Sequence, residues 1–319
     1  MFTILFTAIG RRVELVNAFK SSFKKHNIKV KMIGVDTNPG MAAAGYFVDD
    51  IYKIAKVSET GYVEELLQIC RKQQVNMLIP LFEPEFLKID TYRQQFVDIG
   101  TVVVLSNRRV LEICSNKFDT YAFLKDSGVN TPESWLAGNV REEAEFPLFV
   151  KPCCGMGSMG AQKVINNAEL SSALEYGEDM LIQQYISGTE YTVDVLADFD
   201  GQVLSVVPRE RLEVRSGEVS KSKTVDRPDL IAQAVGIVEK LGAIGPLTLQ
   251  CIDTGSKVYW IEINPRFGGG VPLAIHAGVD YPYIIYQLVK GEKVLPFLGQ
   301  YKKNLVMIRY DQAVYTELA

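Results

Sequence analysis

The first 110 residues alternate short apolar runs with longer stretches in which hydrophobic residues recur every three or four positions. Runs of the first kind predict strands, and stretches of the second kind predict amphipathic helices. The expected strands are 2–7, 31–35, 77–80 and 101–105, and the expected helices are 13–26, 62–73 and 84–96. Strands that alternate with helices favour a parallel sheet covered by helices. We therefore expect a Rossmann-like α/β domain over residues 1–110.

Residues 111–135 are expected to be helical, and from residue 146 the pattern changes to a series of strands with few helices between them. The expected helices are two within 111–135, the second closed by Ser127-Gly128, and one each in 168–176 and 229–241. The expected strands are 146–150, one that ends at Val164, 180–185, 191–198, 203–208, 247–252 and 257–263, with one or two more in 294–319. Consecutive strands joined by short turns are typical of an antiparallel sheet. An α+β organisation is therefore expected for this part of the chain.

The last pair of predicted strands carries polar residues on one face. Gln250 lies on the first strand, and Glu262 and Asn264 lie two apart on the second, so that the alternation of a strand points both to the same side. Three oxygen ligands of this kind suit Mg²⁺. Arg266 follows at the next same-face position, where it would contact an anion beside the metal. The alternative is a hairpin with a solvated polar face, which explains poorly why two polar residues interrupt an apolar strand.

A glycine-rich segment follows the predicted strand 146–150. Lys151 stands at the end of that strand and would supply a positive charge. The loop residues suited to approach a phosphate are Gly155, Gly157, Ser158 and Gly160. Glycines allow backbone N–H groups to approach a ligand closely, and the serine hydroxyl donates a hydrogen bond. The segment lacks the Gly-Lys-Ser/Thr of a P-loop, and alone it is weak evidence because such loops are common.

A third feature is the polar connection between the predicted strands 180–185 and 191–198. Such a hinge is suited to hold an adenine through main-chain groups, with the single acid Glu190 on the ribose hydroxyls. Taken by itself, Glu190 is more often a charge at the edge of a strand.

The N-terminal domain offers two further candidate sites. The first strand–helix turn, residues 7–12, lacks the G-x-G-x-x-G pattern, so we exclude nicotinamide binding even though Asp36 ends the second strand. Arg11 and Arg12 follow Gly10 at a helix N-terminus, where they would either receive an anion or be solvated. Glu83 and Glu85 follow the carboxyl end of a strand, where open α/β sheets bind ligands, although acids beside a proline also begin ordinary helices.

Composition narrows the function classes. The 319 residues include 34 Lys and Arg against 38 Asp and Glu, and a net charge of −4 gives no case for nucleic acid or membrane surfaces as partners. No apolar run approaches the roughly 20 residues of a membrane helix, and no signal peptide is evident, so a cytoplasmic location is expected. Five cysteines without paired C-x-x-C spacing and only two histidines argue against a zinc site. Cys153 and Cys154 are adjacent, and we interpret them as small filler rather than a reactive dithiol.

In this order, the lysine and glycine-rich loop, the hinge and the polar hairpin resemble the ATP-grasp superfamily over residues 116–278. Within it the chain most resembles one synthetase half of the carbamoyl-phosphate synthase large subunit, seen in the residues GPLTLQ and IEINPR. The resemblance implies a Rossmann-like pre-ATP-grasp domain followed by an ATP-grasp domain of two α+β subdomains. The expected boundaries are 1–110, then 111–290 with subdomains of about 111–185 and 186–290, and closing strands in 291–319.

The resemblance also implies roles for individual residues. Lys117 and Lys151 would contact the ATP phosphates, with the loop 154–160 closing over them. The adenine would be held by Gln183, Gln184, Tyr185 and Ile186, and the ribose by Glu190. One or two Mg²⁺ ions, with Mn²⁺ as an alternative, would bind Gln250, Glu262 and Asn264. The chain departs from many relatives at Gln183, where a glutamate is common, which puts the base contact in doubt.

Charged residues near the inferred site would take part in the reaction. Arg266 would steady the transferred phosphoryl group, and Lys151 would neutralise its charge. The segment 209–221 is dense in charge, and Arg211 and Arg215 would line the acceptor side unless the segment is only a solvated hairpin.

The activity implied by the resemblance is ligation of a carboxylate to an amine. The carboxylate would attack the γ-phosphate of ATP to give an acyl phosphate, which the amine then attacks. One alternative is a split half of carbamoyl-phosphate synthase acting on bicarbonate or carbamate, as a homodimer or with a partner subunit that supplies ammonia. Another is an ATP-binding regulatory subunit without turnover, which the intact Lys151, Glu262 and Asn264 disfavour.

Overall fold

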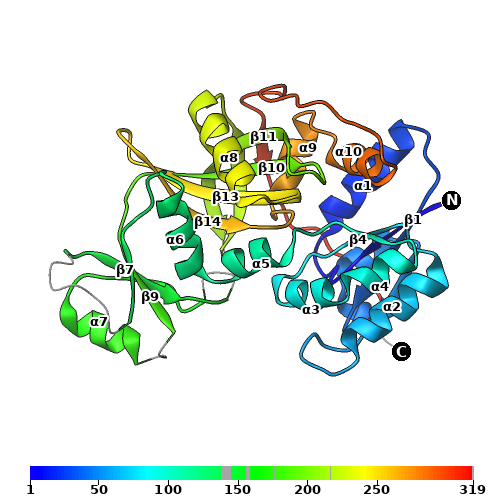
Figure 1. Ribbon diagram of the computed structural model, residues 1–319, viewed down its shortest axis with the longest axis horizontal. Helices are drawn as coiled ribbons and strands as arrows, with labels where there is room; N and C mark the ends of the chain where they lie inside the picture. The colour runs from blue at the N-terminus through cyan, green and yellow to red at the C-terminus, as the bar shows by residue number, and fades with distance from the viewer. Residues whose placement is uncertain (138–144, 156–158, 176, 178, 216, 318–319) are drawn as a thin grey trace.

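A computed structural model of the chain describes residues 1–317 except 138–144, 156–158, 176, 178 and 216. Strands of the described residues form an N-terminal sheet, a small sheet and a central sheet. In Figure 1 the N-terminal sheet lies at the right, the central sheet in the middle, and the small sheet with α7 at the left. The expected α/β and α+β fold class is confirmed.

The N-terminal sheet has five parallel strands in the order β3-β2-β1-β4-β5. They are β1 (Phe2–Phe6), β2 (Val30–Asp36), β3 (Asp50–Lys53), β4 (Met77–Ile79) and β5 (Val102–Val103). The helices of this part are α1 (Val13–Lys25), α2 (Tyr62–Gln73), α3 (Phe86–Thr91) and α4 (Arg93–Asp98), with 3₁₀ turns η1 (Pro39–Met41), η2 (Ala43–Phe47) and η3 (Glu83–Glu85). Alternation within β1 sends Ile4 and Phe6 to the face covered by α1 and Leu5 to the face covered by α2, α3 and α4.

The small sheet has four strands in the order β6-β9-β7-β8. They are β6 (Ser134–Leu136), β7 (Leu148–Pro152), β8 (Gln162–Val164) and β9 (Met180–Gln184), and α7 (Asn167–Leu174) packs on them. Two helices lead into this sheet from the N-terminal one, α5 (Arg108–Ser115) and α6 (Lys117–Asp126).

The central sheet has six strands in the order β14-β13-β10-β11-β12-β15, all antiparallel to their neighbours. They are β10 (Thr189–Ala197), β11 (Val203–Arg215), β12 (Glu218–Thr224), β13 (Gly245–Asp253), β14 (Val258–Asn264) and β15 (Val306–Ile308). One face is covered by α8 (Pro228–Leu241), and the other faces α9 (Val271–His276) and α10 (Tyr281–Val289).

Two predicted helices differ from the structure. The single helix expected at 84–96 is divided at Tyr92, because the second segment turns to bury Phe96 in the core that includes Val103. Within 111–135 the second helix ends at Asp126, as the expected stop at Ser127-Gly128 predicts, and the residues after Gly128, at φ +77°, lead into β6 instead of continuing as helix. Strand β6 then pairs with β9, a long-range contact that local pattern does not reveal.

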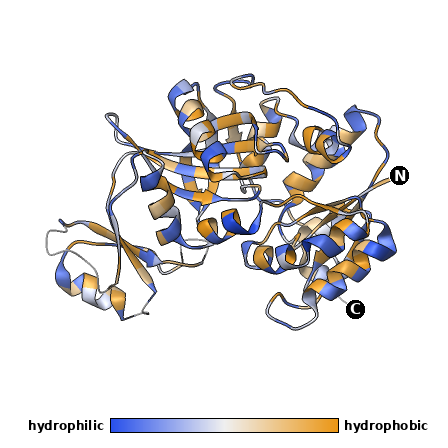
Figure 2. Ribbon diagram, in the orientation of Figure 1, coloured by the Kyte–Doolittle hydropathy of each residue, from blue (hydrophilic) through white to orange (hydrophobic). Residues whose placement is uncertain are grey.

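One core joins the N-terminal and central parts of the molecule. It contains residues of β1 and α1 together with residues of β11, α9 and α10. Phe19 of α1 packs edge to face against Phe267, which follows β14, with ring centroids 6.0 Å apart. Figure 2 shows the apolar residues concentrated in the strands and on the helix faces turned toward them. The end of β14 is therefore fixed against the N-terminal sheet.

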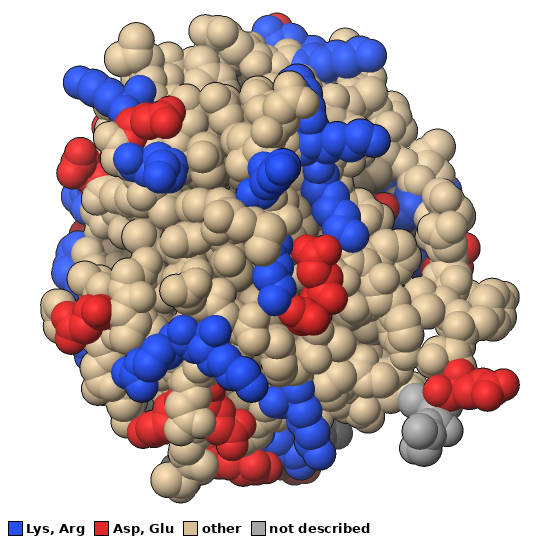
Figure 3. Space-filling view, turned by 90° about the vertical axis from the view of Figure 1, so that its right-hand side faces the viewer, with Lys and Arg blue, Asp and Glu red and all other residues tan. Residues whose placement is uncertain are grey.

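The surface of the N-terminal end carries charges of both signs. In Figure 3, Lys and Arg side chains lie among Asp and Glu on this face, with uncharged residues between them. Among the described residues, every helix is too short or too polar to cross a membrane.

Candidate active site

The polar hairpin is formed by β13 and β14. Gln250 lies directly opposite Glu262, and Thr248 lies opposite Asn264. A register shift between Gln250 and Cys251 leaves this pairing intact at the end nearer the N-terminal sheet. Asn264 is buried and Glu262 is half-buried. The strand alternation therefore brings the three predicted oxygen donors together on one face.

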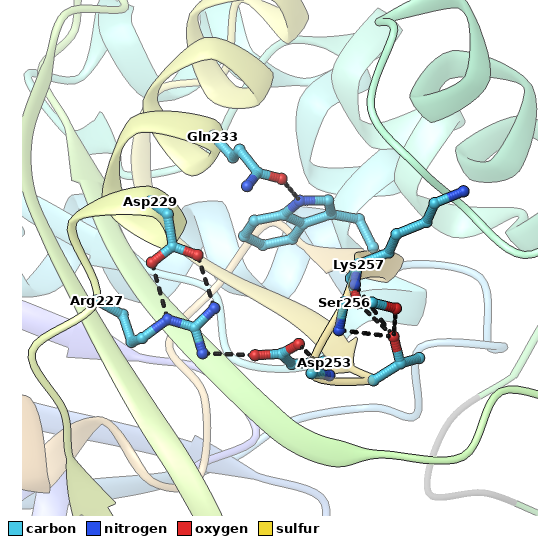
Figure 4. A network of polar contacts seen from close by, with 9 residues as sticks. Arg227, Asp229, Gln233, Asp253, Ser256 and Lys257 are labelled. Atoms are coloured by element: carbon cyan, nitrogen blue, oxygen red, sulfur yellow. Dashed lines mark hydrogen bonds and ion pairs between the residues drawn. The ribbon is translucent and has the colours of Figure 1, made fainter.

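Contacts at the other end of the hairpin fix its position against α8 (Figure 4). The Arg227 guanidinium donates to Asp229 at the start of α8, at 2.6 Å, and to Asp253 at the end of β13, at 2.7 Å. The Trp260 indole donates to Gln233 of α8 at 2.9 Å. Because both strands are tied to the same helix, the polar face is presented by a rigid element.

The three oxygen donors differ in what they already bind. The Gln250 Oε1 accepts a hydrogen bond from Arg211 Nη1 at 3.3 Å, and the Asn264 Oδ1 accepts one from Arg266 Nη2 at 3.2 Å. Each amide oxygen keeps a second lone pair. The Glu262 carboxylate has no hydrogen bond or ion pair with any described residue. An unpaired carboxylate beside two amide oxygens fits the donor preference of Mg²⁺.

The described residues contain no group of three or more His, Cys, Asp or Glu side chains arranged to hold a metal. A cation bound by Gln250, Glu262 and Asn264 would have one carboxylate ligand. Magnesium held by few protein oxygens takes its other ligands from water and phosphate. The set therefore fits a metal that arrives with a phosphorylated ligand.

Lys151 reaches the same region from β7 of the small sheet. It is 9% exposed, and its Nζ donates to Gln183 Oε1 at 3.2 Å. Burial, followed by the nearby Lys117, lowers the pKa of Lys151 to about 8, and Glu262 acts in the opposite direction. Lys151 and Glu262 are thus close enough to interact electrostatically, although they form no ion pair.

The start of α6 is attached to the glycine-rich segment. Asn116 caps the helix by accepting a hydrogen bond from Phe118 N at 2.8 Å. Lys117 donates through its backbone N–H to Cys153 O at 2.8 Å and through Nζ to Gly155 O at 2.9 Å. Lys117 and Lys151 are therefore both next to the beginning of this segment.

Four residues of the glycine-rich segment are predicted to bind phosphate. Gly155 adopts φ +121°, which a residue with a side chain rarely adopts. Gly160 is exposed at the other end, where an added Cβ would lie 3.3 Å from Pro152. Gly157 and Ser158 lie outside the described residues. The structure thus places the two ends of the segment beside β7.

The predicted adenine hinge follows β9. The buried Gln183 side chain lies between Lys151 and Ser134, and its amide donates to Ser134 Oγ at 2.8 Å. Gln184 donates its backbone N–H to Glu133 O at 2.8 Å. The Tyr185 ring is covered by Lys163, with Nζ 4.2 Å from its centroid, and Ile186 is half-buried. Gln183 therefore supports Lys151, while the residues after it are more accessible.

Arg211 of β11 connects two parts of the predicted site. Its Nε lies 3.2 Å from the carboxylate of Glu190, whose side chain is 52% exposed, and its Nη1 donates to Gln250. Burial lowers the pKa of Arg211, while Glu190 and Glu262 raise it. Arg215 instead extends to the surface and pairs with Glu213. The structure thus brings Arg211, and not Arg215, to the hairpin.

Arg266 links the hairpin to the N-terminal sheet. Its Nη2 lies 2.7 Å from Glu83 Oε1, and Glu83 follows β4 in the 3₁₀ turn η3. Glu85 is fully buried, and its carboxylate accepts hydrogen bonds from the Thr7 and Tyr62 hydroxyls. Burial raises the pKa of Glu85. Glu83 and Glu85 were considered together as a candidate site, but their side chains lie in different places. Glu83 contacts the hairpin, and Glu85 is inside the N-terminal domain.

The sequence did not predict that Arg309 lies near the end of the hairpin. Arg309 follows β15 and donates through its backbone to Ser220 O at 2.9 Å. Its Nη1 lies 3.1 Å from Glu218 Oε2. A single arginine in the closing segment carries no local signal, because only the pairing of β15 with β12 brings it there.

Comparison with known proteins agrees with this architecture. An ATP-grasp domain model matches residues 114–270, and a PylC-like N-terminal domain model matches residues 4–104. The chain therefore contains an ATP-grasp domain preceded by a PylC-like N-terminal domain.

Individual relatives are distant. The chain is 26% identical to the arginine-specific carbamoyl phosphate synthase large chain of Geobacillus stearothermophilus, over 96% of this chain and 31% of that protein. It is 23% identical to the 3-methyl-D-ornithine–L-lysine ligase of Methanosarcina acetivorans, over 88% of this chain and 74% of that protein. The biotin carboxylase domain of Hydrogenobacter thermophilus 2-oxoglutarate carboxylase, solved with MgADP and bicarbonate, superposes with a TM-score of 0.76 at 17% identity, over 96% of this chain and 73% of that chain. The chain thus spans about three tenths of the carbamoyl phosphate synthase large chains it matches.

Proposed function

We propose that the chain joins a carboxylate to an amine, using ATP and Mg²⁺, through an acyl-phosphate intermediate. The observation that best supports this function is the approach of Lys151, from the small sheet, to the unpaired carboxylate of Glu262, from the central sheet. A cation and an anion that lie near each other without pairing can hold a phosphate and a metal between them.

The nucleotide would lie between these two sheets. Lys117, Lys151 and the segment 154–160 would contact its phosphates, and Glu190 would bind the ribose. Backbone groups of residues 184–186 would hold the adenine, because the side chain of Gln183 is used to support Lys151.

Magnesium would be held by Glu262, Gln250 and Asn264, and Mn²⁺ accepts the same kind of donors. When bound, the metal neutralises negative charge on the phosphate oxygens. Arg211 and Arg266 orient the two amide oxygens through the hydrogen bonds they donate to them.

The reaction would have two steps. An oxygen of the substrate carboxylate attacks the γ-phosphorus of ATP. The bond from that phosphorus to the β,γ-bridging oxygen breaks, so that ADP is released and an acyl phosphate is formed. The amine nitrogen then attacks the acyl carbon, the C–O bond to phosphate breaks, and the amine proton passes to water. Lys151 and Arg266 would stabilise the negative charge on the transferred group.

The direct test is calorimetric titration of ATP with and without Mg²⁺, followed by measurement of ADP release over a panel of carboxylates and amines. We expect Mg²⁺-dependent binding, and ADP release that requires one carboxylate and one amine together. ADP release with bicarbonate and ammonia alone would instead favour a carbamoyl phosphate synthase-like half reaction. Failure to bind ATP would contradict the proposal.

The Glu262→Gln substitution tests the metal assignment separately. We expect Mg²⁺-dependent ADP release to fall on the order of 100-fold or more, because the only carboxylate among the three donors is lost. The thermal unfolding midpoint should change little, since Glu262 has no described partner to lose. The exposed Glu239→Gln on α8 removes the same charge away from the site and should remain active. An active Glu262→Gln protein would remove Glu262 from the metal site.

A further inference from the structure

Arg12 occupies an unusual position at the junction of the N-terminal and central sheets. It stands at the start of α1, after a turn in which Ala8 and Gly10 have φ of +42° and +39°. Asp36 accepts a hydrogen bond from Gly10 N at 3.2 Å, and Gly10 O accepts one from Ala44 N at 2.9 Å. The turn is therefore fixed on both sides, and Arg12 follows it directly as the N-cap residue of α1.

The Arg12 side chain ends beside the three glycines that follow β14. A Cβ added to Gly269 would lie 3.7 Å from Arg12 Nη1 and 3.8 Å from the carboxyl carbon of Glu218. Arg266 lies three residues before Gly269 on the same segment. Arg12 is thus close to the end of the hairpin that carries Glu262 and Asn264.

Three arginines meet three glutamates at this junction. Arg266 pairs with Glu83, and Arg309 pairs with Glu218 and, at 3.5 Å, with Glu14. Arg12, in contrast, has no side-chain hydrogen bond or ion pair with any described residue.

Arg12 is half-buried, and both cations and anions lie near it. Burial is the leading cause that lowers the pKa of Arg12 to about 10, and Arg266 and Arg309 lower it further. Glu218 and Glu83 act in the opposite direction. A half-buried guanidinium without a hydrogen-bond partner among the described residues is available to a ligand, and a carboxylate matches its two-pronged geometry.

We propose that Arg12 binds a non-reacting carboxylate of an α-amino acid substrate. This inference rests on the proposed ligase function, and it adds the substrate class and a residue that determines specificity. The three arginines and three glutamates balance in charge, which suits a zwitterion better than a phosphate dianion. The carboxylate of the amino acid pairs with Arg12, and its ammonium group lies among the acids of the same junction.

The test compares free amino acids with their α-amides, which keep the ammonium group and the side chain but lose the carboxylate. Binding of each pair to protein saturated with Mg²⁺ and a non-hydrolysable ATP analogue is measured by calorimetry, with ADP release measured in parallel. The wild-type protein should prefer one or more amino acids over their amides by about 10- to 100-fold, as expected for a charged hydrogen-bonded pair.

Arg12→Gln should abolish this preference, and Arg12→Lys should retain only part of it. Arg11→Gln is the matched control, because Arg11 is the exposed neighbour. Affinity for the ATP analogue should be unchanged in all three variants. A merely structural role for Arg12 would weaken amino acid and amide alike, so a preserved preference in Arg12→Gln overturns the inference.

The two proposals fail in different ways. ADP release with other carboxylates, but no binding of any amino acid, overturns the role of Arg12 and leaves the ligase function intact. Amino-acid binding that depends on Arg12, without ADP release in any mixture, supports the role of Arg12 and contradicts the ligase function.

Discussion

The ammonium group of Lys151 depends strongly on its surroundings. It is nearly enclosed in the small sheet, its described hydrogen bond goes to the neutral Gln183, and burial holds its pKa at about 8. A polyphosphate beside it would favour the charged form and raise that pKa again. Nucleotide binding should therefore be coupled to protonation of this one side chain.

The coupling predicts proton uptake at alkaline pH. Below pH 8 Lys151 is charged in both the free and the bound protein, so it takes up no proton. Between its free pKa of about 8 and its higher pKa in the complex, binding must add a proton, and affinity for ATP should fall as pH rises. Calorimetric titrations at pH 7 and pH 8.5, in buffers of different ionisation enthalpy, measure the number of protons taken up.

Two substitutions isolate the contribution of Lys151 to this uptake. Lys151→Gln should bind ATP more weakly and take up fewer protons at pH 8.5. Lys151→Arg keeps a charge that does not titrate in this range, so the uptake should also fall while more of the affinity is retained. Proton uptake equal to wild type in Lys151→Gln would assign the coupling to another group.

Residues of the site differ in how far the sequence could predict them. Glu262 and Asn264 share a face because they are two apart on a strand, a local property that sequence reveals. The contact of Gln183 with Lys151 depends on the pairing of β7 with β9. The gathering of Arg12, Arg266 and Arg309 depends on three segments meeting in the folded chain, so no local spacing predicts it.

At the scale of elements, the turn after β14 explains the three consecutive glycines. A Cβ on Gly268 would lie 2.7 Å from Thr248 Oγ1, and one on Gly270 would lie 2.4 Å from Arg209 Nη1. Arg209 is itself buried and forms an ion pair with Asp194, with hydrogen bonds of 2.5 and 3.0 Å. The turn therefore packs directly on the central sheet. There is no room for a side chain at Gly268 or at Gly270, the residues on either side of Gly269.

This packing predicts different outcomes for neighbouring glycine-to-alanine substitutions. Gly270→Ala should lower the free energy of unfolding by about 1–3 kcal/mol, because the added methyl group meets Arg209. The ion pair with Asp194 holds the Arg209 side chain in place, so it cannot move aside easily. Gly268→Ala should also be destabilising, through its contact with Thr248. Urea denaturation measures the free energy of unfolding of each variant.

Gly269→Ala is the internal control for this series. Its added methyl group meets nothing nearer than 3.7 Å, so stability should stay within about 0.5 kcal/mol of wild type. Equal losses at all three positions would mean that backbone flexibility, and not packing, requires the glycines.

Secondary structure was most predictable where strands or helices alternate regularly. The hairpin β13–β14 and the helix α8 follow directly from their apolar patterns. The break between α3 and α4 and the strand β6 depend on tertiary contacts made by Phe96 and by β9. Strands β3 and β12 were not predicted, because each is rich in charged or polar residues and gains its place through pairing with β2 and β11.

At the scale of the whole molecule, the parts are joined unequally. The N-terminal and central sheets share one continuous core, whereas the small sheet has a separate core of its own. Figure 1 shows the small sheet extending away from the rest of the molecule beyond α6. The small sheet is therefore the less firmly attached part. A ligand held by Lys151 on one side and Glu262 on the other would hold the small sheet against the central sheet.

Hydrogen exchange measured by mass spectrometry can detect this bracing. Saturating MgATP should slow exchange in β7, β9 and the hairpin β13–β14, because local opening of these strands would require loss of the ligand. The parallel strands β1–β5 should exchange as before, since the proposed nucleotide contacts lie elsewhere. ATP with a chelator, and MgATP with Glu262→Gln, should protect the hairpin less. Protection spread equally over all three sheets would contradict a nucleotide bound between the small and central sheets.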